Sequence, residues 1–545
     1  MDKIRIAVSY SSGRSEEFVS DEALIKLEMR PDGNETWLKA EMQLPLIDAF
    51  ATWHSFLTPG LYRMPWREEY PCGAQKNYPF YAVLNREGKV RAALESTNII
   101  DDSKIVFTIN QERCTAQMSL LVTLAAETQP FFIMLDRRGN GLMETLEAWR
   151  ECLALPKMNY PDAAYEPVFC TWYVTHGEVD QAFVERTCPI AKELGFSTLI
   201  VDDGWCYDEY KRVNPDTLPT WYESVGDWDI SKVKFPDFKE HVKRMQALGI
   251  NYMLWVAPHL LGNKSKMHQK YKEQAFSDYI EGFCKLDVNK ADCAPLVEKL
   301  RTLASDNGLD GLKIDFLDTV APNTEKPNSR RTDAFISSLA NGLKKDNPNV
   351  LIEFRQSYAT PAMLKYGTQF RAGDAPFDWR LNFGRLAEIR LNIGSLAPVH
   401  ADPAYWAKGE LPHNVSRHCM AMLAGVPMLS MELESLTDVE KRIISHYVGF
   451  YRQHRSLISH GKWSVLFNQT EIAAAIVENE QERMIILSDG YCLDEALGKC
   501  DKKTWVMNLS DKCLAAKNAT NVLDGECLPA ADGCIPLGGS ALINR

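Results

Sequence analysis

The sequence of 545 residues lacks the features that mark several large classes of protein. It contains no run of about 18 apolar residues, so we expect no membrane-spanning segment. Acidic residues outnumber Lys and Arg by 73 to 61, giving a net charge of −12, and no dense basic cluster interrupts this balance. Neither a nucleic acid nor an anionic membrane is therefore expected as a partner.

Motifs of several common enzyme chemistries are also missing. The sequence has no G-x-G-x-x-G, no P-loop, no H-E-x-x-H and no G-x-S-x-G. These absences argue against dinucleotide-binding folds, P-loop enzymes, zinc proteases and esterases. The 14 cysteines include no C-x-x-C pair, and the 11 histidines show no metal-ligand spacing. We therefore expect no cofactor and no metal.

The cysteines and the first residues predict the cellular compartment. An even number of cysteines is compatible with disulfides, but a chain of this size does not need them. We therefore expect reduced, mostly buried thiols. Residues 4–8 read as a strand, too short and too alternating for the apolar region of a signal peptide. We expect a cytoplasmic protein.

Strand-like patterns occupy both ends of the chain. Residues 1–160 are predicted to form an N-terminal β-sandwich domain, with strands near 4–8, 36–40, 90–94 and 104–109 and a helix near 142–153. Residues 461–545 are predicted to form a small C-terminal antiparallel β domain, with strands near 464–467, 472–477, 483–487 and 504–507.

Residues 161–460 alternate short apolar runs with helical patterns. The runs lie at 169–174, 198–201, 252–256, 311–316, 350–354 and around Phe370, and the helical patterns at 179–194, 238–248, 294–305 and 333–343. Such alternation predicts a parallel sheet. With at least six units over this length, closure into a (β/α)8 TIM barrel is the economical arrangement. The predicted fold class is therefore α/β, a barrel flanked by two β domains.

Functional side chains of such barrels follow the carboxyl ends of the strands. Carboxylates, basic residues and tryptophans occupy those positions here: Trp172, Asp202, Asp203, Trp255, Lys313, Asp315, Glu353, Arg355, Arg371 and Asp374. Carboxylates accept hydrogen bonds from sugar hydroxyls, and aromatic rings stack on the apolar face of a pyranose. Cleavage of a glycosidic bond needs two carboxyl groups beside the anomeric carbon. The pattern favours a glycosidase.

Asp315 is the best candidate for a nucleophile. It lies within an otherwise apolar run, where an ionised carboxylate without partners would be costly. Lys313, two residues earlier, points to the same face and could keep Asp315 anionic. The alternative is a Lys-Asp pair that merely lines the barrel interior.

The remaining acidic positions each have a second interpretation. Asp374 lies in a loop, where an aspartate often caps a helix or stabilises a turn, and Asp378 competes for any role given to it. Asp202 and Asp203 precede a glycine, so they too could form only a turn. Trp228, in a second acidic-aromatic cluster, is either packed at the surface or the wall of a sugar subsite.

At these residues the chain resembles retaining α-galactosidases of glycoside hydrolase family 36, in particular its short, three-domain members. The resemblance covers about 165–455 and the layout on both sides. It rests on six motifs in order: Thr171-Trp172-Tyr173, Val201-Asp202-Asp203-Gly204-Trp205, Gly226-Asp227-Trp228, Trp255-Val256-Ala257-Pro258, Leu312-Lys313-Ile314-Asp315-Phe316-Leu317 and Arg371-Ala372-Gly373-Asp374-Ala375-Pro376-Phe377.

The resemblance implies a role for most of these residues. Asp315 would be the nucleophile and Asp374 the acid/base, with a raised pKa. Asp202 and Asp203 would bind the 4- and 6-hydroxyls. Lys313 and Arg371 would contact ring hydroxyls, and Trp172 and Trp255 would line the pocket. The implied partner is an oligosaccharide or glycoside, and many relatives form homo-oligomers.

One segment departs from the family pattern. Where relatives often have a Cys-Gly or Cys-Ser pair near the 2-hydroxyl, this chain has Glu353 and Arg355. These two either pair with each other, or Arg355 reads a charged or substituted sugar such as a uronate, a sulfated or an N-acetylated residue. The hypotheses are therefore an α-galactosidase, the same chemistry on another α-linked sugar, a transglycosylase, and a non-catalytic carbohydrate-binding barrel.

Overall fold

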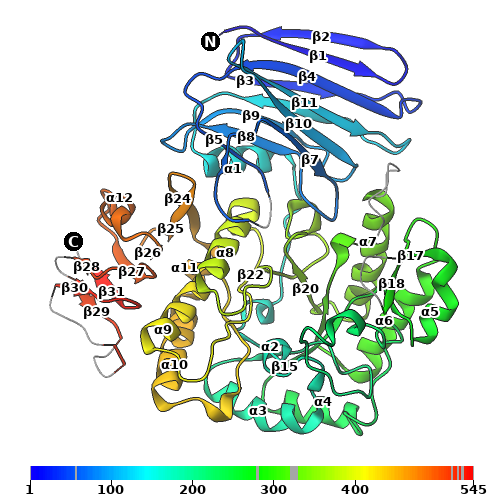
Figure 1. Cartoon of the computed structure of the whole chain (residues 1–545), viewed down its shortest axis with the longest axis vertical. Helices are drawn as coiled ribbons and strands as arrows, with labels where there is room; N and C mark the ends of the chain where they lie inside the picture. Colours follow the sequence, from blue (N-terminus) through cyan, green and yellow to red (C-terminus); the bar gives the residue numbers. More distant parts are fainter. Residues whose placement is uncertain are drawn as a thin grey trace.

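The computed structural model describes residues 2–55, 58–277, 282–319, 329–516, 519–523, 527–528 and 533–543. Two N-terminal β-sheets, an α/β barrel and a C-terminal sheet follow one another along the chain. In Figure 1 the N-terminal sheets lie above the barrel, and the C-terminal sheet lies at its left. This architecture confirms the predicted fold class. The domain boundaries at 160 and 460 stay predictions.

Two six-stranded sheets share one core at the N-terminus. Residues of β1 (Ile4–Tyr10) alternate between buried and more exposed positions, as expected for a strand with one face on a core. The first sheet has the order β2 (Ser15–Ser20), β1, β4 (Trp37–Pro45), β11 (Thr115–Thr123), β10 (Ser103–Asn110) and β7 (Arg67–Cys72). The second has the order β3 (Leu24–Met29), β12 (Phe131–Asp136), β9 (Val90–Ser96), β8 (Phe80–Leu84), β5 (Ala51–Trp53) and β6 (Tyr62–Arg63). Their buried side chains form one cluster, which makes the pair a sandwich.

The barrel is built from eight parallel strands. They are β13 (Val168–Cys170), β14 (Thr198–Val201), β15 (Asn251–Val256), β19 (Gly311–Ile314), β20 (Leu351–Arg355), β21 (Gln369–Arg371), β22 (Val399–His400) and β23 (Met428–Leu429). Strands β13 and β23 pair directly. A parallel bridge between His400 and Val426, just before β23, closes the ring.

The last two barrel strands were not identified from the sequence. Strands β22 and β23 contain two residues each, too few to show a period in an apolar pattern. The first strand is also shorter than predicted, because the chain turns into helix α2 (Trp172–Thr175) directly after it. Trp172 therefore stands at the start of a helical turn rather than on a strand.

The predicted helices are confirmed, as α3 (Gln181–Glu193), α4 (Phe238–Ala247), α6 (Ala294–Asn307) and α7 (Ser329–Asp346). Helix α3 shows why: its N-cap Asp180 accepts from the Phe183 N–H, and Val184, Cys188 and Ala191 form its buried face. The helices that follow include α8 (Trp379–Ile393), α9 (Pro412–Ala421) and α10 (Asp438–Gln453). No helix within the described ranges is long and apolar enough to cross a membrane.

The C-terminal sheet has the order β24 (Lys462–Asn468), β25 (Glu471–Glu478), β26 (Glu482–Leu487), β27 (Lys503–Asn508), β31 (Ser540–Ile543) and β29 (Ala519–Asn521). All neighbouring strands are antiparallel except β26 and β27. This one parallel pair has helix α12 (Leu493–Leu497) in its connection, as parallel neighbours require a crossover.

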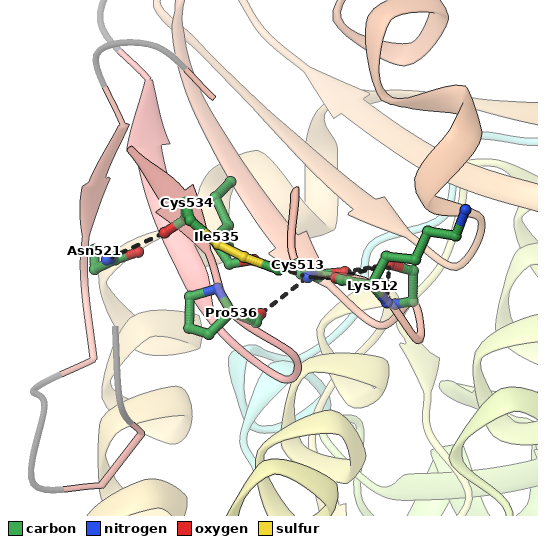
Figure 2. Close-up of a disulfide and its surroundings, with 8 residues drawn as sticks. Lys512, Cys513, Asn521, Cys534, Ile535 and Pro536 are labelled. Atoms are coloured by element: carbon green, nitrogen blue, oxygen red, sulfur yellow. Dashed lines mark hydrogen bonds between the residues drawn. A yellow bond between two sulfur atoms is a disulfide. The ribbon is translucent and has the colours of Figure 1, made fainter. Parts of the chain in front are cut away.

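One expectation about the cysteines was wrong. Cys513 and Cys534 form a disulfide, with their Cα atoms 6.2 Å apart (Figure 2). The short strands β28 (Leu514–Ala515) and β30 (Cys534–Ile535) pair side by side and bring the two cysteines together. Their separation of 21 positions hides this proximity in the sequence.

The sandwich docks on the barrel through α8. Glu388, buried in α8, accepts hydrogen bonds from the Gly60 N–H at 3.0 Å and from Trp53 Nε1 at 3.5 Å. Arg150 of α1 (Leu142–Cys152) donates to the Leu391 carbonyl, three residues further along the same helix. Because α8 follows the loop that carries Asp374, the sandwich holds the helix that anchors this loop.

Candidate active site

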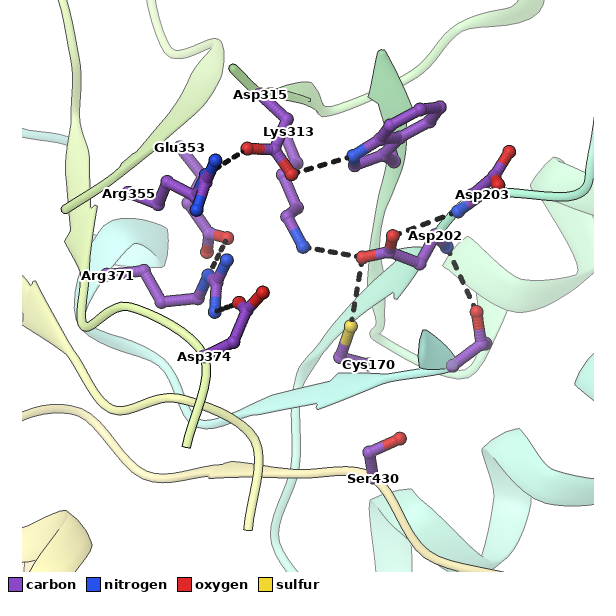
Figure 3. Close-up of polar contacts among 12 residues, drawn as sticks. Cys170, Asp202, Asp203, Lys313, Asp315, Glu353, Arg355, Arg371, Asp374 and Ser430 are labelled. Atoms are coloured by element: carbon purple, nitrogen blue, oxygen red, sulfur yellow. Dashed lines mark hydrogen bonds and ion pairs between the residues drawn. The ribbon is translucent and has the colours of Figure 1, made fainter. Parts of the chain in front are cut away.

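Polar side chains from four strands converge at the carboxyl ends of the barrel strands. Figure 3 shows Asp202 and Asp203 after β14, Lys313 and Asp315 from β19, Glu353 and Arg355 from β20, and Arg371 and Asp374 from β21 and the loop behind it. The structure thus brings together the acidic and basic residues that the sequence selected. Parallel strands make this possible, since their carboxyl ends lie at one edge.

Asp315 is buried and fully hydrogen-bonded. Its side chain is 9% exposed. Trp255 Nε1 donates to Oδ2 at 2.9 Å, and the Phe316 N–H donates to Oδ1 at 2.8 Å. Arg355 Nε forms an ion pair with Oδ1. Burial by itself raises the pKa of Asp315, but the charges of Arg355, Lys313 and Arg371 outweigh burial and hold the pKa well below its usual range.

Lys313 contacts a different carboxylate from the one expected. Its Nζ lies 2.6 Å from Asp202 Oδ2, and no contact with Asp315 is seen among the described atoms. The Cys170 thiol donates to the same Asp202 oxygen at 3.3 Å. Lys313 therefore acts on Asp315 only through its charge, and Arg355 supplies the direct partner.

Asp203 offers an unoccupied acceptor. Its Oδ2 accepts from Trp221 Nε1 at 2.7 Å and from the Tyr207 hydroxyl at 3.3 Å. Its Oδ1 is buried and has no hydrogen-bond partner among the described residues. Burial raises the pKa of Asp203 to about 6. A buried acceptor without a donor is costly, so this atom is suited to a ligand hydroxyl.

The turn after Asp203 requires glycine. Gly204 has a φ of +118°, and a Cβ there would lie 2.7 Å from Gly177 Cα. The Asp-Asp-Gly sequence therefore forms a turn, which was the second interpretation of Asp202 and Asp203. The same turn places both carboxylates at the site.

Glu353 and Arg355 do not pair with each other. Glu353 lies one step deeper in β20, fully buried, with Oε1 at 3.4 Å from Arg371 Nε on the neighbouring strand. Arg355, at the end of β20, reaches Asp315 and lies 4.0 Å from Asp318 Oδ1. Burial raises the pKa of Glu353 to about 7, against the lowering effect of Arg371.

Asp374 differs from Asp315 in its exposure. Its side chain is 52% exposed, and Arg371 lies 3.1 Å from its Oδ1. Burial raises its pKa, but Arg371 and Arg355 outweigh this effect and the pKa is lowered. The raised pKa expected for Asp374 was therefore wrong. Asp378, its competitor, is the N-cap of α8 and accepts from the Leu381 N–H.

The sequence analysis missed Asp402. This fully buried residue follows β22, pairs with Arg371, and accepts from the Ala375 N–H and the Tyr173 hydroxyl, each at 2.7 Å. Burial raises its pKa to about 7. Its position after a barrel strand was the available signal, but a two-residue strand could not be recognised.

The predicted tryptophans take different positions. Trp255 donates to Asp315, and buried Trp228 packs edge-on against Trp255 with ring centroids 5.9 Å apart. Trp172 is half-buried and lies 5.1 Å from the ring of Trp221, a residue that sequence reasoning missed. Trp172 and Trp221 form an aromatic face beside Asp203.

Among the described residues, no group of three or more His, Cys, Asp or Glu side chains is arranged to hold a metal ion. The chemistry that these residues can perform themselves is acid–base and nucleophilic catalysis by carboxylates.

Comparisons with known proteins identify a family for this chain. Residues 146–461, more than half of the chain, match the family model described as Melibiase. The chain is 21% identical over 366 residues to alpha-galactosidase AgaA of Geobacillus stearothermophilus, covering 62% of this chain and 47% of that protein. It is 22% identical over 351 residues to alpha-galactosidase 1 of Pediococcus pentosaceus, covering 58% and 45%. The chain thus spans about half the length of these curated relatives.

Solved structures share the fold. A variant of alpha-galactosidase AgaA from Geobacillus stearothermophilus, in complex with 1-deoxygalactonojirimycin, superposes with a TM-score of 0.67 at 16% identity, covering 99% of this chain and 80% of that one. The alpha-galactosidase of Thermus thermophilus, in complex with stachyose, gives 0.55 at 15% identity, covering 78% and 96%. With the family model extending over the whole barrel and its site, the chain belongs to the melibiase family.

Proposed function

We propose that this protein is a retaining, exo-acting α-galactosidase that releases terminal α-linked galactose from oligosaccharides. The observation that carries the proposal is a buried Asp315, held ionised by Arg355, at the same barrel mouth as the exposed Asp374. The family adds support, since curated relatives are named alpha-galactosidases and neighbouring structures are described in complex with raffinose and stachyose.

The proposed reaction is a double displacement. In the first step Asp315 attacks the anomeric carbon, the bond to the leaving oxygen breaks, and protonated Asp374 gives its proton to that oxygen. In the second step water attacks the same carbon, Asp374 takes the proton from the water, and the bond to Asp315 breaks. Galactose leaves with its α configuration retained.

The side of the site away from Asp374, where Asp202 and Asp203 lie, would hold the galactose ring. Asp203 Oδ1 is buried and has no donor among the described residues, and the neighbouring Asp202 pairs with Lys313. In the proposal these two carboxylates bind the 4- and 6-hydroxyls, while Trp172 contacts the apolar face of the ring. Arg371, enclosed by Glu353, Asp374 and Asp402, would act mainly by fixing those carboxylates.

The contacts of Arg355 bear on the choice of sugar. Its guanidinium already faces Asp315 and Asp318, so an anionic substituent would meet two carboxylates as well as one cation. This arrangement favours a neutral sugar over a uronate or a sulfated galactoside. An N-acetylated sugar is neutral and stays the alternative substrate.

A panel of p-nitrophenyl glycosides tests the proposal. We expect turnover of the α-galactoside, with α-galactose as the first product seen by NMR. Activity only on α-glucosides or β-linked sugars, or none at all, would reject it. Asp315→Ala should abolish turnover, and added azide should restore part of it by forming β-galactosyl azide. Inversion at the anomeric carbon would reject the retaining mechanism alone.

The location and assembly of the enzyme are part of the same proposal. We propose that it acts in the cytoplasm, which fractionation of the source cells tests. A homo-oligomer is likewise proposed from the family resemblance, and size-exclusion chromatography with light scattering tests it.

A further inference from the structure

Phe377 is an exposed aromatic residue beside the candidate acid. It lies three residues after Asp374, in the loop between β21 and α8, and its side chain is 59% exposed. Its φ is +62°, in the left-handed region that bulky residues rarely adopt. Such a conformation is strained for a residue with a bulky side chain. Because the ring is exposed, burial of its apolar surface does not compensate for this backbone strain.

The ring is nevertheless held in place. It packs edge-on against Tyr405, with centroids 5.0 Å apart and the planes at 61°. Half-buried Tyr405 in turn packs against Tyr173, at 5.9 Å. The Tyr173 hydroxyl donates to Asp402 Oδ2, the atom that also accepts from the Ala375 N–H. One network therefore fixes both the exposed ring and the backbone beside Asp374.

The chemistry of the proposed reaction says which part of a substrate would lie there. A general acid must be within hydrogen-bond reach of the oxygen that leaves. The leaving group therefore lies on the Asp374 side of the site, away from the buried Asp202 and Asp203. Phe377 lies on the same loop as Asp374, and its exposed ring offers an apolar surface on which the apolar C–H face of a sugar leaving group can stack.

We propose that Phe377, supported by Tyr405, forms the subsite for the leaving group, and that its occupant is a sugar ring. This inference rests on the proposed function and narrows it. The preferred substrates are α-galactosides joined to another sugar, in contrast to α-galactosides of small alcohols.

The test compares two substrates that differ only in the leaving group. Melibiose releases glucose, whereas methyl α-galactoside releases methanol and has no ring to stack. In Phe377→Ala the ratio of kcat/KM on melibiose to kcat/KM on methyl α-galactoside should fall about tenfold. Phe377→Tyr should keep the wild-type ratio. Trp66→Ala removes an exposed aromatic of the sandwich and should leave the ratio unchanged.

Phe377→Gly separates stacking from backbone strain. Glycine suits a φ of +62°, so this variant relieves the strain while removing the ring. We expect the same fall in the ratio as for Phe377→Ala. A wild-type ratio in Phe377→Gly would overturn the proposal, because strain relief alone would then explain the alanine variant. An equal loss on both substrates would overturn it too, since the ring would then only support the Asp374 loop.

Two further measurements keep the outcomes distinct. In the inactive Asp315→Ala background, calorimetry should show that Phe377→Ala weakens binding of melibiose several-fold more than binding of methyl α-galactoside. A change of oligomeric state in Phe377→Ala would instead assign the ring to an interface and overturn the subsite. Failure of the proposed function is separate, since wild-type enzyme would then turn over neither α-galactoside.

Discussion

Asp315 and Asp374 stand at the same barrel mouth in opposite surroundings. Asp315 is 9% exposed, follows a barrel strand, and has a donor or ion-pair partner on both oxygens. Asp374 is 52% exposed and lies on a loop, with Arg371 as its ion-pair partner. A nucleophile must stay ionised in one fixed place, whereas an acid/base must gain and lose a proton beside a changing leaving group. The two surroundings match these two tasks.

The largest effects should come from removing each carboxylate in turn. Asp315→Ala should lower kcat/KM by about 10⁴-fold or more on every substrate, because no group replaces the attacking oxygen. Asp374→Ala should lower kcat/KM on melibiose by about 10²- to 10⁴-fold. Its loss on 2,4-dinitrophenyl α-galactoside should be much smaller, since that leaving group needs no proton.

Asp378→Ala is the matched control for Asp374→Ala. It removes an aspartate from the same loop, but this one caps α8. It should reduce stability by about 1 kcal/mol and leave the preference for activated substrates unchanged. Equal losses on melibiose and on the dinitrophenyl substrate in Asp374→Ala would break the assignment of the acid.

A variant of Arg355 tests what keeps the buried Asp315 ionised. Arg355→Gln removes the cation that most lowers the pKa of Asp315, so that pKa should rise. Activity requires ionised Asp315, and the acid limb of the kcat/KM profile should therefore move to higher pH. We expect a loss of roughly tenfold near neutral pH. Arg355→Lys should restore part of the charge effect. An unshifted acid limb would show that Lys313 and Arg371 are sufficient to keep Asp315 ionised without Arg355.

The exposed Asp374 should determine the basic limb of the pH profiles. Arg371 and Arg355 lower the pKa of Asp374 in the free enzyme. As the pH rises, free Asp374 therefore loses its proton at a lower pH than an ordinary aspartate does. A bound sugar displaces water from this carboxyl group and should raise its pKa. The basic limb of kcat, which reports the complex, should therefore lie at higher pH than the basic limb of kcat/KM. Coincident limbs would contradict this.

Asp402 sharpens the same comparison with a smaller effect. It shares Arg371 with Asp374, so Asp402→Asn leaves more of that cation to Asp374. In the substrate complex, where Asp374 loses its proton at higher pH and Asp402 is ionised, the pKa of Asp374 should fall, and the basic limb of kcat on melibiose should move to lower pH. Asparagine still accepts from the Ala375 N–H, which limits damage to the loop. A lower kcat/KM with no shift of the limb would assign Asp402 a purely structural role.

The sequence predicted the parts of the site that stand beside recognisable patterns. Asp315 interrupts an apolar run, and Asp202 and Asp203 end one, so their positions followed from period and burial. Pairings could not be predicted in the same way. The carboxylate that Lys313 contacts depends on the direction of its side chain across the barrel. Arg355 pairs with Asp315 and not with Glu353, because Arg355 lies two residues nearer to the carboxyl end of β20 than Glu353 does.

Residues on short elements were beyond the sequence analysis. Asp402 follows a strand of two residues, and Trp221 lies in an irregular segment, so neither had a period to mark it. The disulfide between Cys513 and Cys534 depends on two equally short strands. Sequence patterns report regular elements of several residues, and contacts made outside them appear only in three dimensions.

The smallest effect concerns the contact that anchors the Asp374 side from a distance. Burial raises the pKa of Glu388 to about 8, although the Gly60 N–H and Trp53 Nε1 oppose the shift. Because the folded pKa lies above the unfolded value, the folded state binds the extra proton between about pH 4.5 and pH 8. Stability should therefore fall as pH rises through this window.

Glu388→Gln keeps an oxygen for the Gly60 N–H and removes the titration. The unfolding temperature of the wild type should drop by a few degrees more than that of Glu388→Gln between pH 5 and pH 9. Activity on the activated dinitrophenyl substrate should change little, because it does not depend on Asp374 as an acid. A loss confined to melibiose would show that docking of the sandwich, through α8, sets the position of the exposed carboxylate and not that of the buried one.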